Sequence, residues 1–156
     1  CGHYGSSSQP CRCTARQIHQ YQTRISGPLM DRIDIHIEVP AVRYRDLTGK
    51  YNGETSAAVA ARIAAAREVQ QARFKNAKDS VNARMSDRQI KAYCILDEES
   101  RRMVEMAVDK LGLSARAYTR ILKVARTVAD LDGSESIEAC HVAEAIQYRT
   151  LDRRIV

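Results

Sequence analysis

Residues 113–133 read LSARAYTRILKVARTVADLDG, and this stretch decides the fold class. Ser114 is a good helix N-cap, and Gly133 is typical of the residue that ends a helix. Between them, apolar residues recur with the spacing of one helix face: Tyr118, Ile121, Leu122, Ala125, Val128 and Ala129. An apolar stripe needs other helices to pack against, so the stretch predicts a helix inside a bundle.

The segments around this helix carry start and stop signals of their own. Ser86 and Gln89 form a capping-box pair. Asp97 precedes two glutamates in the first turn of a helix that Gly112 ends. The expected helices span about residues 14–21, 56–76, 86–94, 97–111 and 138–148, in addition to the one after Ser114. The chain is therefore predicted to be mainly α, with a bundle of four to five helices in its later part.

The composition agrees with packed helices. Hydrophobic residues make up 44% of the 156 residues, whereas aromatic residues make up 5%, with one Phe and no Trp. The core must therefore consist mostly of aliphatic side chains and alanine. No apolar run is long enough to cross a membrane, so we expect neither a transmembrane span nor a membrane partner.

A second stretch, SGPLMDRIDIHIEVP at residues 26–40, presents a single arginine between two elements. Ser26 and Pro28 suit the start of a helix, so one helical turn is expected up to Arg32. Apolar residues then alternate with polar ones, which predicts one β-strand at 33–39. A single strand is not stable alone, so its sheet is expected to lie in sequence upstream of this chain.

The first residue and the cysteine content indicate the origin of the chain. It begins with Cys1 rather than Met and has no leader-like segment, so we interpret it as a fragment of a longer cytoplasmic protein. Its five cysteines are an odd number. Cys94 and Cys140 fall in predicted helices, where reduced thiols act as small apolar residues.

The net charge of +6 comes almost entirely from residues 55–96, which carry eight Lys/Arg and three Asp/Glu. The eight cations are Arg62, Arg67, Arg73, Lys75, Lys78, Arg84, Arg88 and Lys91. A local positive surface is typical of a DNA partner, although a solvated helix face is the commoner explanation. Because Phe74 and Tyr93 are the only aromatic residues in this segment, any DNA contact is expected at the backbone rather than the bases.

Three segments together resemble one family, the magnesium-chelatase-like AAA+ ATPases of the ComM/YifB type. The opening CG and the following CRCT are similar to the end of the cysteine-rich loop of that family. The segment RISGPLMDRIDIHIEV is similar to the element that follows the loop. The stretch LSARAYTRILKVARTVADLDG, with the later HVAEAIQYR, is similar to the C-terminal helical lid.

The resemblance implies a division into two parts. Residues 1–54 correspond to the tail of an AAA+ core, which comprises the cysteine-rich loop, an arginine-finger turn, the strand and a linker over 41–54. Residues 55–156 correspond to the helical lid domain. The other branch of the family comprises the true magnesium chelatases of chlorophyll synthesis. The cysteine loop and the sequence SGPLMDRID resemble the ComM-like branch more than that one.

The resemblance also implies an ATPase that uses ATP and Mg²⁺ in a homo-oligomeric ring. The ring is expected to be a hexamer, and the motor is expected to process DNA as ComM-type branch-migration motors do in natural transformation. No G-x-x-x-x-G-K-[ST] phosphate loop occurs in these 156 residues, so we expect no independent ATPase activity from this chain.

Arg32 is the first candidate site residue. By resemblance it is the arginine finger, which reaches from one subunit toward the γ-phosphate bound by its neighbour. That role needs a permanently charged planar donor on a rigid base. The alternative from the sequence alone is a structural residue that pairs with Asp31 or Asp34, and Arg24 is a competing finger candidate.

Arg116 and Arg120 are the second candidates. The resemblance places the sensor-2 arginine, which contacts ATP from the lid, at Arg116, with Arg120 as a weaker candidate. Arg116, Arg120 and Lys123 share one helix face, which in most proteins simply faces solvent. Asp130 and Asp132 near the end of the helix are expected to pair with nearby cations or to cap the helix end.

Cys1, Cys11 and Cys13 form the third candidate site, a zinc site. The Cys-x-Cys spacing lets two thiolates reach one ion, and His3 is a candidate for the fourth ligand. The family loop carries another cysteine before Cys1, and in that case His3 is an incidental loop residue. His19, His36 and His141 lack partner spacing and are expected to be surface or satisfied core histidines.

Two other readings compete with the ATPase fragment. One is a free-standing basic helical module that binds nucleic acid, and the other is a zinc-stapled interaction domain without enzymatic activity. The single predicted strand favours the hypothesis of an ATPase fragment, because a free-standing module would hold no second strand for it to pair with.

Overall fold

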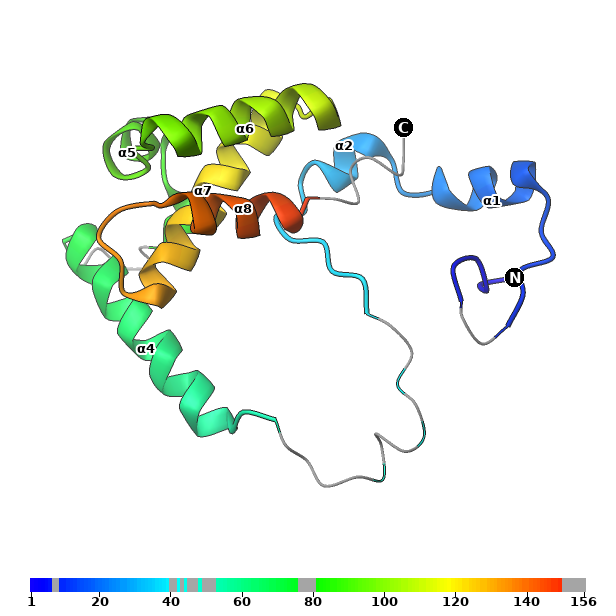
Figure 1. The fold of residues 1–156 in the computed structure, drawn as a ribbon, viewed down its shortest axis with the longest axis horizontal. Coiled ribbons are helices and arrows are strands. Elements are labelled where there is room, and N and C mark those ends of the chain that lie inside the picture. The colour runs from blue at the N-terminus through cyan, green and yellow to red at the C-terminus, as the bar shows by residue number, and fades with distance from the viewer. Residues whose placement is uncertain are drawn as a thin grey trace.

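The computed structural model describes residues 1–6, 9–39, 42, 44, 48, 53–75 and 81–149. The described chain is mainly helical, as predicted (Figure 1). Its elements are α1 Ala15–Gln22, α2 Gly27–Met30, α4 Ser56–Arg73, the 3₁₀ turn η1 Asn82–Arg84, α5 Asp87–Tyr93, α6 Glu98–Leu111, α7 Ala115–Asp132 and α8 Ala139–Gln147. The prediction of a helical bundle in the later part of the chain is confirmed.

Local capping chemistry sets most of these boundaries. The Ser86 hydroxyl and the Gln89 side chain form the predicted capping box at the start of α5. Asp97 accepts a hydrogen bond from the Ser100 amide at the start of α6. Gly112 ends α6 with a φ of 61°, in the left-handed region that glycine adopts without steric cost.

Helix α7 lies at the centre of the bundle and contacts α4, η1, α5 and α8, while α6 packs on α8 (Figure 1). The buried apolar core comprises Met85, Ile90, Cys94, Val104, Ile121, Leu122, Ala125, Ala129, Ile137, Val142 and Ala145. The predicted stripe on α7 is shifted at its start, because Ala117 is fully buried whereas Tyr118 is 40% exposed. The helix face that packs inward at this end is therefore the one that carries Ala117.

A buried ionic network lies beside this apolar core. The Asp130 carboxylate accepts hydrogen bonds from Arg126 Nε at 3.0 Å, Asn82 Nδ2 at 2.7 Å and Arg73 Nη1 at 2.7 Å. Arg126 also donates to the carbonyl oxygens of Ser134 and Glu135. The network thereby joins α4, η1 and the turn after α7 to α7 itself. The pairing of Asp130 with cations is confirmed.

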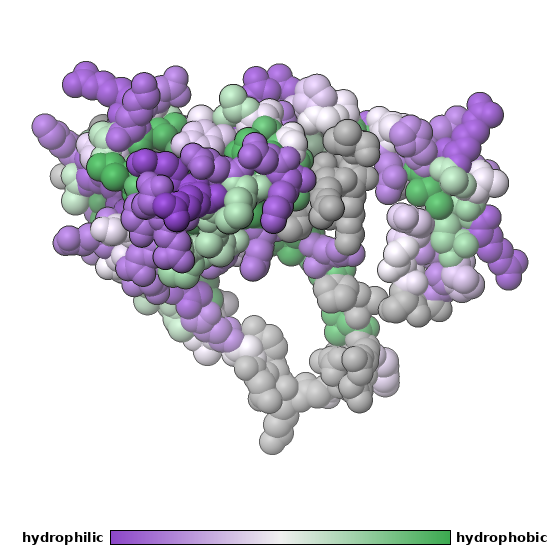
Figure 2. All heavy atoms as spheres, turned by 45° about the horizontal axis from the view of Figure 1, so that its top comes forward, coloured by the Kyte–Doolittle hydropathy of each residue, from purple (hydrophilic) through white to green (hydrophobic). Residues whose placement is uncertain are grey.

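The strand predicted at 33–39 does not form. These residues are outside any helix and make no β-ladder, because no neighbouring strand lies beside them among the described residues. Ile33, Ile35, Ile37 and Val39 are between 41% and 80% exposed. Hydrophobic side chains of this segment lie at the molecular surface (Figure 2). The linker predicted at 41–54 lies largely outside the described residues, and the boundary between residues 54 and 55 stays a prediction.

The two cysteines of the helical part differ in burial. Cys94 is buried in the core, and desolvation raises the pKa of its thiol to about 11, although the positive charges of Arg126 and Arg73 oppose the shift. Cys140 is a free thiol in α8, as its predicted helical position implied, but it is exposed and does not pack as a small apolar residue. The prediction rested on its helical position, which does not reveal which face is outward.

None of the described helices is both long and apolar enough to cross a membrane.

The network around Asp130 generates a stability prediction. Burial alone would raise the pKa of Asp130. The hydrogen bonds from Arg73 and Asn82 and the charges of Arg73 and Arg126 outweigh burial, so the pKa of Asp130 lies below its usual value. Folding therefore favours the ionised carboxylate of Asp130. Its contribution to the free energy of unfolding is fully present above about pH 5 and is lost as the pH falls through the pKa of the folded state. Asp130→Asn is expected to lower the free energy of unfolding by about 3 kcal/mol at pH 7, since it leaves buried cations uncompensated.

Urea unfolding followed by circular dichroism, at a series of pH values from 7 down to about 2, checks this expectation. The exposed Asp109→Asn on α6 is the matched control and is expected to change stability by less than about 0.5 kcal/mol. Equal loss of stability on acidification in wild type and Asp130→Asn would show that Asp130 is not the titrating group.

Candidate functional site

Arg32 lies immediately after the short helix α2, on an exposed turn. Its Nη1 donates to the Pro28 carbonyl at 2.8 Å, which bends the side chain back along the turn. Met30, the last residue of α2, is buried. Ser26 is the N-cap residue by backbone position, but its hydroxyl makes no capping hydrogen bond.

The carboxylates that were alternative partners of Arg32 contact other residues. Asp31 Oδ2 accepts a hydrogen bond from the Ser114 hydroxyl at 2.9 Å. Asp34 forms an ion pair with Arg120. Within the part of the chain that the structure describes, the Arg32 guanidinium therefore keeps most of its donors available. Arg24, the competing candidate, lies with its guanidinium carbon 5.8 Å from the centre of the Tyr21 ring.

The three cations of α7 do not form one uniform solvent face. Arg120 is held by Asp34, and Lys123 Nζ donates to the Ala83 carbonyl at 2.9 Å. Arg116 lies exposed in the first turn of α7. The structure thus gives Arg120 a partner within the chain, and it leaves the Arg116 side chain directed to solvent.

Arg149 is a residue of this region that sequence reasoning missed. Its side chain is 1% exposed, and its Nη2 lies 3.7 Å from Asp31 Oδ1. Its Nη1 also donates to the Ile33 carbonyl. The sequence signal was its position at the end of HVAEAIQYR, but nothing in the local pattern indicates a buried cation.

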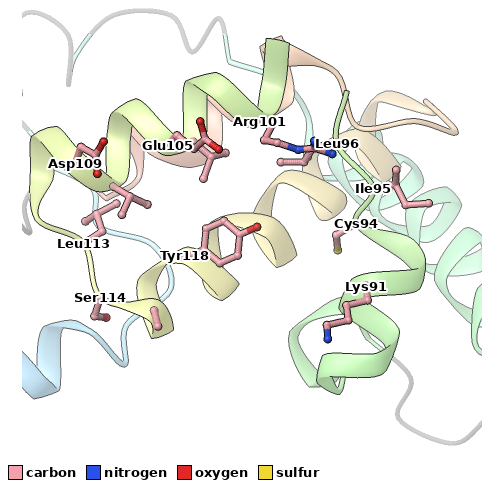
Figure 3. Close-up of a pocket in the computed structure, with 13 residues that line it drawn as sticks. Lys91, Cys94, Ile95, Leu96, Arg101, Glu105, Asp109, Leu113, Ser114 and Tyr118 are labelled. Carbon is pink, nitrogen blue, oxygen red and sulfur yellow. The ribbon is translucent and has the colours of Figure 1, made fainter. Parts of the chain in front are cut away.

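A groove of about 780 Å³ lies between the end of α5, α6 and the start of α7 (Figure 3). Lys91 and Arg101 supply positive charges, and Glu105 and Asp109 supply negative ones. The Tyr118 ring lies between them on the α7 side (Figure 3). Because charges of both signs line the groove, it presents no concentrated positive charge for a phosphate group.

The thiols of Cys1, Cys11 and Cys13 converge near the amino end of α1. Cys1 Sγ lies 3.5 Å from Cys11 Sγ and 3.3 Å from Cys13 Sγ, and all three sulfur atoms lie within 4.8 Å of one another. Thr14, the next residue, caps α1 through its hydroxyl and thereby fixes the end of this loop. Three convergent thiols suit a soft cation such as Zn²⁺, which takes four ligands in structural sites. His3 does not belong to this group in the described part of the chain.

The basic segment is less free than its composition indicates. Arg62 makes a two-pronged pair with Glu54, at 2.9 Å and 3.1 Å, and Arg73 is held by Asp130. Lys78 lies outside the described residues. At least Arg62, Arg73 and Arg84 therefore interact with other residues of the chain, which reduces the charge available to a polyanion.

Comparison with known proteins defines the class of protein. A family profile described as magnesium chelatase, subunit ChlI C-terminal, matches residues 53–149, and a second, described as magnesium chelatase, subunit ChlI, matches residues 1–47. The chain belongs to the magnesium chelatase family.

Individual relatives show which type of protein within the family the chain resembles. The chain is 40% identical over 156 residues to the uncharacterized protein YifB of Salmonella typhimurium, and 42% identical over 154 residues to the competence protein ComM of Haemophilus influenzae. An uncharacterized protein of Mycobacterium tuberculosis is 30% identical over 146 residues. These alignments cover 99%, 97% and 94% of this chain but only 30%, 29% and 29% of the relatives. The chain thus matches the C-terminal region of ComM/YifB-type proteins.

Proposed function

We propose that this chain supplies the arginine finger and the sensor-2 side of an ATPase site in an oligomeric ring. The observation that carries the proposal is the state of Arg32. It lies exposed on an anchored turn, while both adjacent carboxylates are occupied by other residues. An arginine that only stabilised the turn would be expected to pair with one of them.

In this function Arg32 acts on the nucleotide of a neighbouring subunit. Its guanidinium would spread positive charge over two phosphate oxygens as negative charge develops during transfer of the γ-phosphoryl group. A permanently charged group is suitable because it needs no proton exchange during the reaction. The anchored turn reduces the entropy that is lost when the guanidinium is positioned.

Arg116 would contact the phosphates of ATP from the start of α7. The positive end of the α7 dipole and the guanidinium charge both favour an anion there. Arg120 would then support this end of α7 through its ion pair with Asp34. ATP and Mg²⁺ would be held mainly by the rest of the longer protein, since this sequence has no phosphate loop. We expect the ring to be a hexamer in the cytoplasm.

We propose that the motor acts on DNA, as the resemblance to ComM-type branch-migration motors implies. One of the relatives is named competence protein ComM. The paired state of Arg62 and Arg73 argues against the alternative of a free-standing nucleic-acid-binding module. The positive charge that remains on this segment supports weak backbone contact within an assembled ring.

We also propose that Cys1, Cys11 and Cys13 hold one zinc ion. The fourth ligand would come from outside the described group, in keeping with the further cysteine of the family loop. The ion would fix the loop against the amino end of α1, which buries no residue of its own.

The finger assignment predicts the behaviour of Arg32→Ala in the full-length protein. Steady-state ATP hydrolysis is expected to fall by about 10³-fold, because the finger acts mainly in the transition state. Equilibrium binding of a fluorescent ATP analogue and the ring size are expected to stay near wild type. Arg24→Ala is the matched control and is expected to retain turnover. Wild-type hydrolysis by Arg32→Ala would show that the finger lies elsewhere.

The zinc assignment predicts about one zinc per chain in full-length protein purified without added metal, measured by mass spectrometry. Cys11→Ser and Cys13→Ser are expected to lose most of the metal, whereas the exposed Cys140→Ser is expected to retain it. Metal-free wild-type protein with an unchanged fold would rule the site out.

A further inference from the structure

The turn that carries Arg32 is fastened to the start of α7, where Arg116 lies. The Ser114 hydroxyl donates to Asp31 and accepts a hydrogen bond from the Ala117 amide at 3.1 Å. The same hydroxyl thus begins α7 and holds the residue next to Arg32. Because Asp31 and Ser114 are in contact, the two candidate arginines extend from backbone segments that lie side by side.

The end of α8 clamps the same turn from another direction. Arg149 lies buried against Asp31 and donates to the carbonyl of Ile33. The backbone amide of His36 donates to the Tyr148 carbonyl at 2.8 Å. Contacts on both sides of Arg32 in the sequence therefore bind this turn to the helical bundle.

An ion pair completes the connection. Asp34 pairs with Arg120, which lies one helical turn after Arg116 on the same helix. The side chain of Arg120 is 25% exposed and that of Asp34 is 43% exposed, so solvent only partly screens the pair. The pair limits rotation of the Arg32 turn about its contact at Ser114.

We propose that Asp31 and Asp34 are positioning residues that hold Arg32 and Arg116 in one rigid unit. The inference rests on the proposed ATPase function and adds to it the residues that set the position of the finger. Arg32 itself has a long flexible side chain with one hydrogen bond, to Pro28. The placement of its turn therefore decides whether the guanidinium reaches the phosphate.

Loss of this placement has a specific kinetic consequence. A displacement of about 1 Å in a group that acts in the transition state costs up to about 10²-fold in rate. Ground-state binding of ATP depends chiefly on other residues, so the nucleotide dissociation constant is expected to stay unchanged. A residue that merely stabilised the fold would instead lower the melting temperature or impair ring assembly.

The test uses Asp34→Asn in the full-length protein. We expect kcat to fall by about 10-fold, with an unchanged dissociation constant for a fluorescent ATP analogue and an unchanged ring size. The exchanged pair Asp34→Arg with Arg120→Asp is expected to restore most of the turnover, since it re-forms the contact with reversed charges. Glu98→Gln, which removes exposed ion pairs with Arg101 and Arg102 on α6, is the matched control and is expected to be silent.

Each outcome has a separate meaning. Loss of turnover in Arg32→Ala with full turnover in Asp34→Asn would overturn the positioning role and leave the proposed function intact. Full turnover in Arg32→Ala would reject the proposed function itself. If the exchanged pair assembles into rings but its kcat stays as low as that of Asp34→Asn, loss of the ion pair is not the cause of the lower turnover. Weaker nucleotide binding in Arg120→Gln but not in Asp34→Asn would show that Arg120 contacts the nucleotide directly, which also overturns the proposal.

Discussion

The packing of this chain depends on one buried carboxylate, that of Asp130 on the central helix. A charge at this depth is tolerated only when cations and hydrogen-bond donors surround it. The donors come from α4, η1 and α7 itself, so neutralising the charge also fixes the relative positions of these elements. Apolar packing alone would leave α4 poorly specified, because only Ala66 and Gln70 of its residues are buried.

The sequence predicted those features that depend on neighbours within a few residues. The caps at Ser86, Asp97 and Ser114 are examples, because each involves a side chain and a backbone amide three residues further on. Features set by distant partners were not predictable. The strand at 33–39 was expected from alternation, but alternation does not supply the neighbouring strand that a ladder needs.

The candidate site shows the same limit. Arg32 and Arg116 were identified by resemblance, and the sequence offered Asp31 and Asp34 only as partners for Arg32. Ser114 and Asp31 are 83 residues apart, so their hydrogen bond leaves no trace in local spacing. Arg149 was missed for a related reason. A cation near the end of a helix is normally solvated, and its burial depends on a carboxylate from the far end of the chain.

The segment at 33–39, whose four apolar side chains are exposed, also has a consequence for the behaviour of the chain in isolation. It forms no β-ladder with other described residues, and the side chains of Ile33, Ile35, Ile37 and Val39 are exposed. A segment of this kind is a template with which the same segment of a second copy of the chain can pair as a β-strand. Repeated pairing leads to insoluble aggregates. The exposed β-branched side chains of residues 33–39 are therefore expected to lower the solubility of the chain whenever no other strand pairs with them.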